Sequence, residues 1–275
     1  MFLGAEAKDC LYVNWAVPLA QAPPLPEPLR YELHRPGSGG AGTPAPAGGA
    51  SGETGDTVFF SALCFHLSGL HPELLPLLRI SYPQLTFRTY VLDGDNVPSV
   101  LFVRVWVPFW VAPLSRWIGR QPASPGLFRF PPPTRERLQD SFRWQVRSNQ
   151  SLEIAARVAA PIAGGRPSLG SFDRTVEYFR RRPRGYVIDG GDVRAIDRSH
   201  PQVDVLPLAV EIADAALLHT AWPGVAPGIW NAPHSAWLCP EIPFSFELGP
   251  PIQLPLPAMR SMPAAQARFR GALRR

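Results

Sequence analysis

The sequence predicts an α+β protein that is mostly β and folds as a single domain. Its 275 residues are 45% hydrophobic and 18% charged, which excludes a disordered chain, a coiled coil and a small disulfide scaffold. Two hairpin signals lie in the chain, each a short turn between runs of β-branched and aromatic residues. Alternating segments occupy much of the remainder. A chain of this length can bury one large core.

The first part of the chain predicts three strands and one long loop. Residues 11–17, 29–34 and 57–67 are rich in strand-forming side chains. Between the last two, residues 36–55 are almost entirely Gly, Ala, Pro, Ser and Thr, so we expect a flexible loop inside the domain. The string G-x-G-x-x-G at 37–42 matches a dinucleotide-binding motif by chance, because no strand leads directly into it and no helix follows.

The strongest hairpin signal joins strands predicted at 85–92 and 97–107. The turn between them reads Asp-Gly-Asp-Asn, residues that tolerate positive φ. Strict alternation then places Thr86, Arg88 and Tyr90 on one face of the first strand. The sequence therefore brings an arginine and a tyrosine to the same side of a central hairpin.

The remaining segments predict further strands and three helices. Strands are expected at 126–130, 141–147 and 151–159, in a second hairpin at 185–197, and at 237–248, where prolines favour a sheet edge. Helices are expected at 109–120, 208–218 and 171–182, the last capped by Ser171. The tail at 250–275 is Pro-rich and then basic, so we expect it to fray beyond a domain of residues 1–249.

Charge and cysteine content favour the cytoplasm. The net charge is +5, yet Lys8 is the sole lysine beside 26 arginines, a skew that coding bias explains. Cys10, Cys64 and Cys239 form no Cys-x-x-Cys pair and indicate reduced, buried thiols. Residues 1–9 are charged where a signal peptide would be apolar, so we do not expect export. Arg104 and three prolines interrupt the apolar window that follows the turn, so we do not expect a membrane span.

Several motifs resemble a known family. The chain contains Tyr-Pro-Gln-Leu-Thr-Phe-Arg-Thr-Tyr-Val at 82–91 before the Asp-Gly turn, Asn14-Trp15, Phe59-Phe60, the segment 168–182, Gly-Tyr-Val at 185–187 and Asp-Arg-Ser-His-Pro at 197–201. Over residues 10–248 it resembles the uncharacterised bacterial YqjF-like family of the acetoacetate decarboxylase-like superfamily. Residues 99–104 and 178–182 depart from that family's Gly-x-Tyr-Phe run and Arg-Tyr pair. The resemblance implies an antiparallel β-barrel or cone with a few flanking helices and an interior pocket.

The resemblance also implies a test for lysine chemistry. Acetoacetate decarboxylases use a lysine inside the barrel, whose Schiff base draws electrons from the departing carboxylate. No lysine occurs from Leu11 to Leu248, and Lys8 falls in a start that we expect to be unstructured. We therefore expect a protein of this type without Schiff-base lysine chemistry and without a cofactor, and the sequence leaves open whether it is an enzyme.

The candidate ligand-binding residues are Arg88 and Tyr90, with Arg104 and Trp106 on the partner strand. A sheltered arginine needs an anion or acceptors, because an isolated buried charge is costly. Arg88 could hold the carboxylate of a small ligand through two parallel hydrogen bonds, with Tyr90 adding a hydroxyl. The partner would then be a small apolar or carboxylate-bearing molecule.

Alternatives to a ligand site remain open. Arg88 could instead pair with a glutamate such as Glu241 or Glu211, which the sequence alone favours, and the domain could be a packed structural or interaction scaffold. The arginines at 180–184 more readily suit a helix C-terminus than a nucleic-acid surface. The six histidines show no metal-ligand spacing, so no metal site is predicted.

Overall fold

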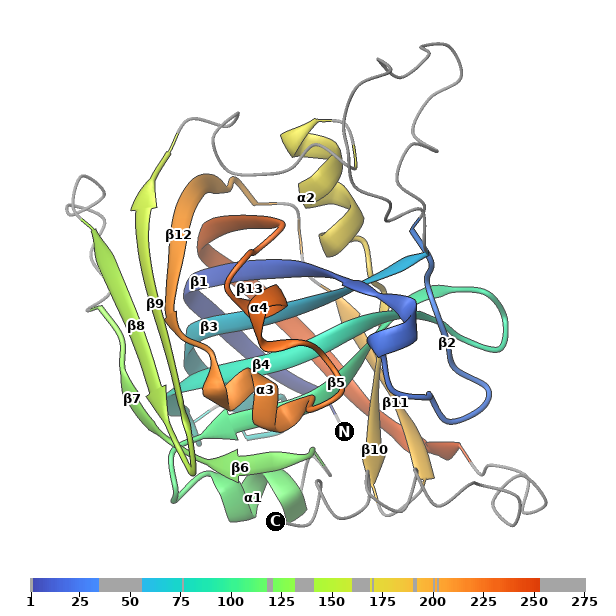
Figure 1. Cartoon of the computed structure of the whole chain (residues 1–275). Helices are drawn as coiled ribbons and strands as arrows, with labels where there is room; N and C mark the ends of the chain where they lie inside the picture. Colours follow the sequence, from blue (N-terminus) through green and yellow to red (C-terminus); the bar gives the residue numbers. More distant parts are fainter. Residues whose placement is uncertain are drawn as a thin grey trace, which may run out of the picture.

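A computed structural model describes most of the chain (Figure 1). The described residues are 2–34, 56–75, 77–117, 121–131, 141–159, 169, 171–189, 192–199, 201 and 203–252. The expected loop at 36–55 and the tail beyond residue 252 lie outside these ranges. The single-domain organisation and the cytoplasmic location stay predictions.

The described part is mostly strand, as predicted. The strands are β1 Phe2–Pro18, β2 Arg30–Tyr31, β3 Thr57–Pro72, β4 Ile80–Leu92, β5 Pro98–Val107, β6 Ala123–Pro125, β7 Leu127–Arg129, β8 Phe142–Arg147, β9 Ser151–Val158, β10 Arg184–Asp189, β11 Asp192–Ser199, β12 Leu206–Asp214 and β13 Ser235–Ile252. The helices are α1 Ala112–Trp117, α2 Phe172–Arg180, α3 Ala216–Ala221 and α4 Pro227–Trp230, with a short 3-10 turn at Leu19–Gln21. Both predicted hairpins are confirmed, as is the Ser171 cap, whose hydroxyl accepts from the Arg174 N–H.

The strands form one strongly curved sheet whose central members are β1, β3, β4 and β5 (Figure 1). Its order continues through β10, β11 and β13 to β12, β9, β8 and β7. Most pairings are antiparallel, but β5 pairs in parallel with both β10 and β6. The antiparallel arrangement that the resemblance implies therefore holds for most pairings but not for these two, because β10 is reached through the outer strands and α2 and not through a hairpin. Closure into a barrel or cone stays a prediction.

The central strands bury both faces. One face packs against α3, α4 and the layer of β7, β8, β9 and β12, and we call this the outer core. The other face packs against α2 and the inward side chains of β13, and we call this the inner core. Strand β4 alternates between them: Leu85 and Phe87 belong to the outer core and Tyr90 to the inner core.

The helix expected at 208–218 is wrong for its first half. Residues 206–214 form β12, and the helix α3 begins only at Ala216. Leu206, Leu208, Val210 and Ile212 alternate toward the outer core and pair with β9 or β13, which favours the strand. The Asp214 carboxylate accepts the Ala216 N–H, 2.9 Å away, where the strand gives way to the helix.

The edge position expected for 237–248 is also wrong. Strand β13 runs unbroken from Ser235 to Ile252 and pairs with β1 on one side and with β12 and β11 on the other. Strands β1 and β13 are not paired at Asp9 and Pro240, where Asp9 has a φ of 49°. This local gap in the pairing is part of the reason that β13 tolerates its prolines. Strand β1 begins at Phe2, so Lys8 is not in an unstructured start.

No helix among the described residues combines the length and hydropathy that crossing a bilayer requires.

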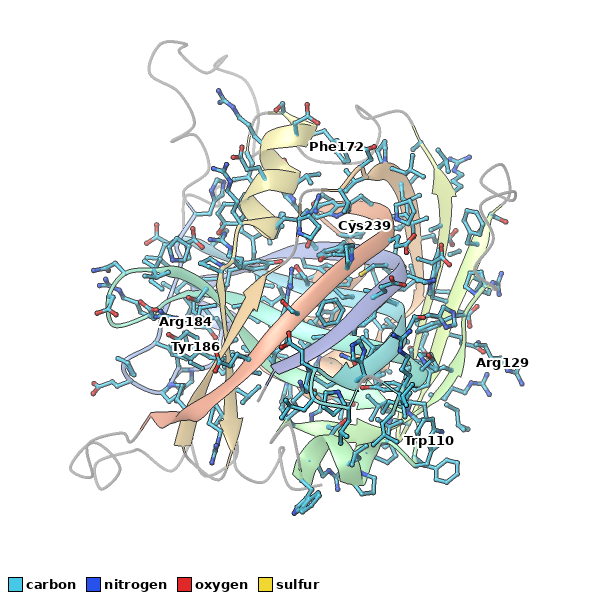
Figure 2. All side chains as sticks on the ribbon, turned by 180° about the vertical axis from the view of Figure 1, so that it is seen from behind. Trp110, Arg129, Phe172, Arg184, Tyr186 and Cys239 are labelled. Carbon is cyan, nitrogen blue, oxygen red and sulfur yellow. The ribbon has the colours of Figure 1, made fainter. Side chains whose placement is uncertain are left out.

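Asp93 fastens the central hairpin to β10. Its Oδ1 accepts the N–H groups of Asp95 and Val97, each at 2.9 Å, which shapes the turn. Its Oδ2 accepts from the Arg184 Nη1 and the Tyr186 hydroxyl, also at 2.9 Å (Figure 2 labels Arg184 and Tyr186). Burial acts to raise the pKa of Asp93, but these donors outweigh it and the pKa lies below its usual value.

We expect Asp93→Asn to lower the free energy of unfolding by about 2 kcal/mol near neutral pH, because the new amide N–H₂ faces two donors. A lowered folded-state pKa gives stability that is present above the unfolded value of about 3.9 and is lost as pH falls through the folded pKa. Between about pH 4 and pH 2 the free energy of unfolding should therefore fall less steeply in the variant than in the wild type. Urea unfolding at several pH values measures both effects. Asp95→Asn, at an exposed position, is the control, and equal unfolding curves for wild type and Asp93→Asn would contradict the assignment.

Candidate functional site

A partly enclosed cavity of about 130 Å³ lies within the inner core. An apolar cavity of roughly 150 Å³ is known to hold benzene, so the space suits a small ligand. The apolar lining is Ala7, Leu63, Phe65, Leu67, Leu70, Phe102, Ile196, Ile242 and Phe244, and the polar lining is Cys10, Tyr12, Tyr82, Gln84, Thr86, Arg88 and Gln121. Six strands, β1, β3, β4, β5, β11 and β13, contribute to this wall.

Arg88 is the one cationic residue among those that line the cavity. It is 4% exposed, and its Nη2 donates to the Tyr90 hydroxyl at 3.3 Å and to the Phe179 carbonyl at 3.4 Å. Its Nε is buried without a hydrogen-bond partner. Among the residues that the structure describes, no carboxylate forms an ion pair with it. Most of the hydrogen-bonding capacity of a buried guanidinium is therefore unused.

The surroundings of Arg88 favour its charged form but, among the described residues, supply no carboxylate as a counter-charge. Burial acts to lower the pKa of the guanidinium, but the Tyr90 and Tyr12 hydroxyls outweigh burial and the pKa lies above its usual value. The guanidinium carbon lies 5.4 Å from the centroid of the Tyr12 ring and 5.5 Å from that of Tyr90, within cation–π range. The Phe179 carbonyl belongs to the last turn of α2, where the helix dipole is negative.

Within the described part of the chain, a second buried arginine nearby differs from Arg88 in having a carboxylate beside it. Arg182 forms an ion pair of 2.9 Å with Glu32, and its guanidinium carbon lies 4.4 Å from the centroid of the Tyr178 ring. It also lies 5.2 Å from the centroid of Tyr90. The Tyr90 ring therefore contacts two guanidinium groups, and of these Arg182 has a carboxylate partner while Arg88 has none among the described residues.

The ion pair that the sequence favoured for Arg88 does not form. Glu241 and Glu211 are both exposed. In the strand register Glu241 lies opposite Lys8 and Glu211 lies opposite Ala155. Neither carboxylate reaches the buried guanidinium.

Arg104 and Trp106 lie away from the cavity, on the face of the sheet opposite to Arg88. In the β4–β5 register Arg104 is opposite Phe87, which is in the outer core, and Trp106 is itself in that core. The Arg104 Nη1 donates to the Ser124 hydroxyl at 3.0 Å. A β-bulge causes the separation: Arg88 pairs with Phe102 while Phe87 pairs with Arg104, so one extra residue reverses the alternation of β5.

Sequence reasoning missed the other polar groups of the cavity wall. Tyr12 and Cys10 come from β1, Gln84 from β4 and Gln121 from the segment after α1. The alternation of Cys10, Tyr12 and Asn14 in β1 was a usable signal for one shared face. What the sequence did not reveal is that β1 pairs with both β3 and β13, which brings that face toward Arg88.

The four arginines of the basic run at 180–184 all have protein partners. Arg180 donates to the Val203 and Pro201 carbonyls, Arg181 pairs with Glu177, Arg182 with Glu32 and Arg184 with Asp93. Of these contacts, the Arg184 ion pair ties β10 to the central hairpin, while the Arg181 pair is local to the end of α2. Among the described residues no group of three or more His, Cys, Asp or Glu side chains is arranged to hold a metal ion.

Comparisons with known proteins give a family and a fold. The model of the DUF2071 family, described as an uncharacterized conserved protein, matches residues 45–242. The enduracididine biosynthesis enzyme MppR, complexed with the condensation product of pyruvate and imidazole 4-carboxaldehyde, has a TM-score of 0.57 at 13% identity, covering 91% of this chain and 88% of that one. An acetoacetate decarboxylase-like enzyme from Sphingomonas wittichii RW1 has a TM-score of 0.52 at 16% identity, covering 92% of each chain. No curated protein matches. At these identities the two structures establish a shared fold.

We expect Arg88→Met to leave the free energy of unfolding unchanged or to raise it by up to about 2 kcal/mol, because it removes a desolvated charge and retains an unbranched chain of similar length. Urea unfolding of the two proteins measures this. A loss of more than about 2 kcal/mol would show that Arg88 is a structural tie and that its present acceptors suffice.

Proposed function

We propose that this chain, which belongs to the DUF2071 family of uncharacterized conserved proteins, binds a small molecule that combines a carboxylate with an apolar body. Arg88 would hold the carboxylate. The observation that carries the proposal is a buried guanidinium at the cavity wall whose Nε has no protein partner. A ligand carboxylate is the group that best satisfies such a donor, because charge-assisted hydrogen bonds to guanidinium are short and strong.

The order of strand pairing supports a closed wall around this site. The sheet runs from β1 through β3, β4, β5, β10 and β11 to β13, and β13 pairs again with β1. We take these seven strands to form the barrel or cone that the family resemblance implies. A closed wall excludes water from the guanidinium and strengthens its attraction for an anion.

The remaining lining favours an apolar ligand body. Leu63, Ile242 and Phe244 present hydrocarbon and aromatic surface to the cavity, and Thr86 and Tyr12 add hydroxyl groups. Sites for small molecules commonly combine an apolar wall with a few convergent polar groups. The ligand we propose is therefore an aromatic or short branched carboxylate, not a polyanion.

The fold neighbours support a carboxylate ligand but not their own chemistry here. One MppR structure, with a TM-score of 0.52 at 12% identity, is described as complexed with pyruvate, itself a carboxylate. A Schiff base would require a lysine at the cavity, and the sole lysine, Lys8, forms an ion pair with Glu6 at 3.4 Å and is not among the lining residues. We therefore propose that the protein binds a carboxylate ligand. Any reaction of that ligand would proceed without a lysine. The closer likeness to the bacterial YqjF-like proteins stays a prediction.

Benzoate and benzyl alcohol form a matched pair of probes, because they share a ring and differ in the charged group. We expect the protein to bind benzoate at least about tenfold more tightly, a preference that Arg88→Met abolishes. The preference should be constant from about pH 5.5 to pH 8.5, where carboxylate and guanidinium are both ionised. Isothermal titration calorimetry measures both affinities.

Arg104→Met is the matched control, since it removes an arginine from the same sheet on the face away from the cavity. It should leave the benzoate preference unchanged. If neither probe binds the wild-type protein, or if Arg88→Met retains the preference, the proposal is wrong and the alternative of a structural or interaction scaffold gains support.

A further inference from the structure

We infer that Ser61 and Asn14 are positioning residues for the Arg88 site, a role that for ligand binding rests on the proposed function. They direct the proton of the Tyr90 hydroxyl away from Arg88 and so keep that hydroxyl as an acceptor for the guanidinium. The same arrangement prevents Tyr90 from donating to a ligand.

A line of buried polar side chains crosses the four strands β4, β3, β1 and β13. From Arg88 it runs to the Tyr90 hydroxyl at 3.3 Å, then to the Ser61 Oγ at 2.6 Å. The Ser61 Oγ lies 2.5 Å from the Asn14 Oδ1, and the Asn14 Nδ2 lies 3.1 Å from the Ser235 Oγ and 3.3 Å from the Ser235 carbonyl. None of the five residues is more than 4% exposed. Such a line is costly to bury unless every member is satisfied.

The direction of each proton follows from groups of fixed polarity at the two ends. The Ser235 carbonyl can only accept, so the Asn14 atom beside it is the amide nitrogen and the amide oxygen faces Ser61. That oxygen accepts the single proton of Ser61, which must then accept the single proton of Tyr90. At the other end Arg88 can only donate, so the Tyr90 hydroxyl accepts from it. The groups at both ends therefore require the same sequence of donors and acceptors along the line.

This order changes the role expected of Tyr90. The sequence suggested that Tyr90 adds a hydroxyl to the ligand site, but its proton is donated to Ser61 and the residue is not among those lining the cavity. Tyr90 instead shares Nη2 with the Phe179 carbonyl, which anchors one side of the guanidinium. The Nε–H stays without a protein acceptor. Anchoring one nitrogen while leaving another unsatisfied preorganises the group for an anion.

A test without ligand uses the Nε–H signal of Arg88 in protein labelled at arginine Nε, assigned by its absence from Arg88→Met. We expect Ser61→Ala to shift or broaden this signal, because Tyr90 loses its acceptor and no longer holds Nη2. Thr89→Val is the matched control: Thr89 is fully buried, donates to the Phe59 carbonyl at 2.9 Å and neighbours Arg88 on the other face of β4. An unchanged signal in Ser61→Ala, or an equal change in Thr89→Val, would overturn the positioning role.

A second test measures benzoate and benzyl alcohol affinities in a double-mutant cycle. Ser61→Ala and Tyr90→Phe should each weaken benzoate binding about threefold to tenfold, the effect of losing one hydrogen bond, and leave benzyl alcohol unaffected. The double variant should bind benzoate no more weakly than Tyr90→Phe, since Ser61 acts through Tyr90. Additive losses would contradict the inference. If the wild type shows no benzoate preference, the proposed function fails, and the ligand-free Nε–H comparison still decides the positioning role.

Discussion

The burial of the Arg88 guanidinium without a carboxylate is the constraint on which the site depends. Removing such a charge from water costs several kcal/mol after relaxation, as an order of magnitude. Two aromatic rings, one helix carbonyl and one hydroxyl offset part of this cost. Arg182, with Glu32 beside it, shows that the same fold can supply a full counter-charge. Leaving Arg88 short of acceptors is consistent with a position kept for an anion from outside the chain.

The framework around Arg88 buries nearly all of its surface. The bulge in β5 places Phe102 beside Arg88 and turns Arg104 to the opposite face. Asp93 ties the turn of the same hairpin to β10, which continues the wall. Helix α2 covers the inner core and brings the Phe179 carbonyl to the guanidinium. Local hydrogen bonds at the turn, in the strands and at the helix end therefore act together on one side chain.

Local patterns predicted the strands and the face of β4 well, and contacts between distant segments poorly. The Asp-Gly turn, the alternation through Arg88 and the Ser171 cap all rest on neighbouring residues, and the structure has all three. The helix expected at 208–218 was wrong because alternating aliphatic residues there pack across to β9. The bulge that separates Arg104 from Arg88, and the approach of Tyr12 and Asn14 to β3 and β13, depend on pairing register, which no local pattern contains.

The solved structures that resemble this chain share its fold, and its sole lysine lies on β1 outside the cavity lining. Arg88 is therefore the group that we propose binds the anion. A crystal structure of the protein grown with benzoate tests this most directly. We expect a carboxylate oxygen within hydrogen-bonding distance of the Arg88 guanidinium and the ring against Ile242 and Phe244. Benzoate bound elsewhere while the cavity holds only water, or an Arg88 side chain turned to a carboxylate of the protein, would contradict it.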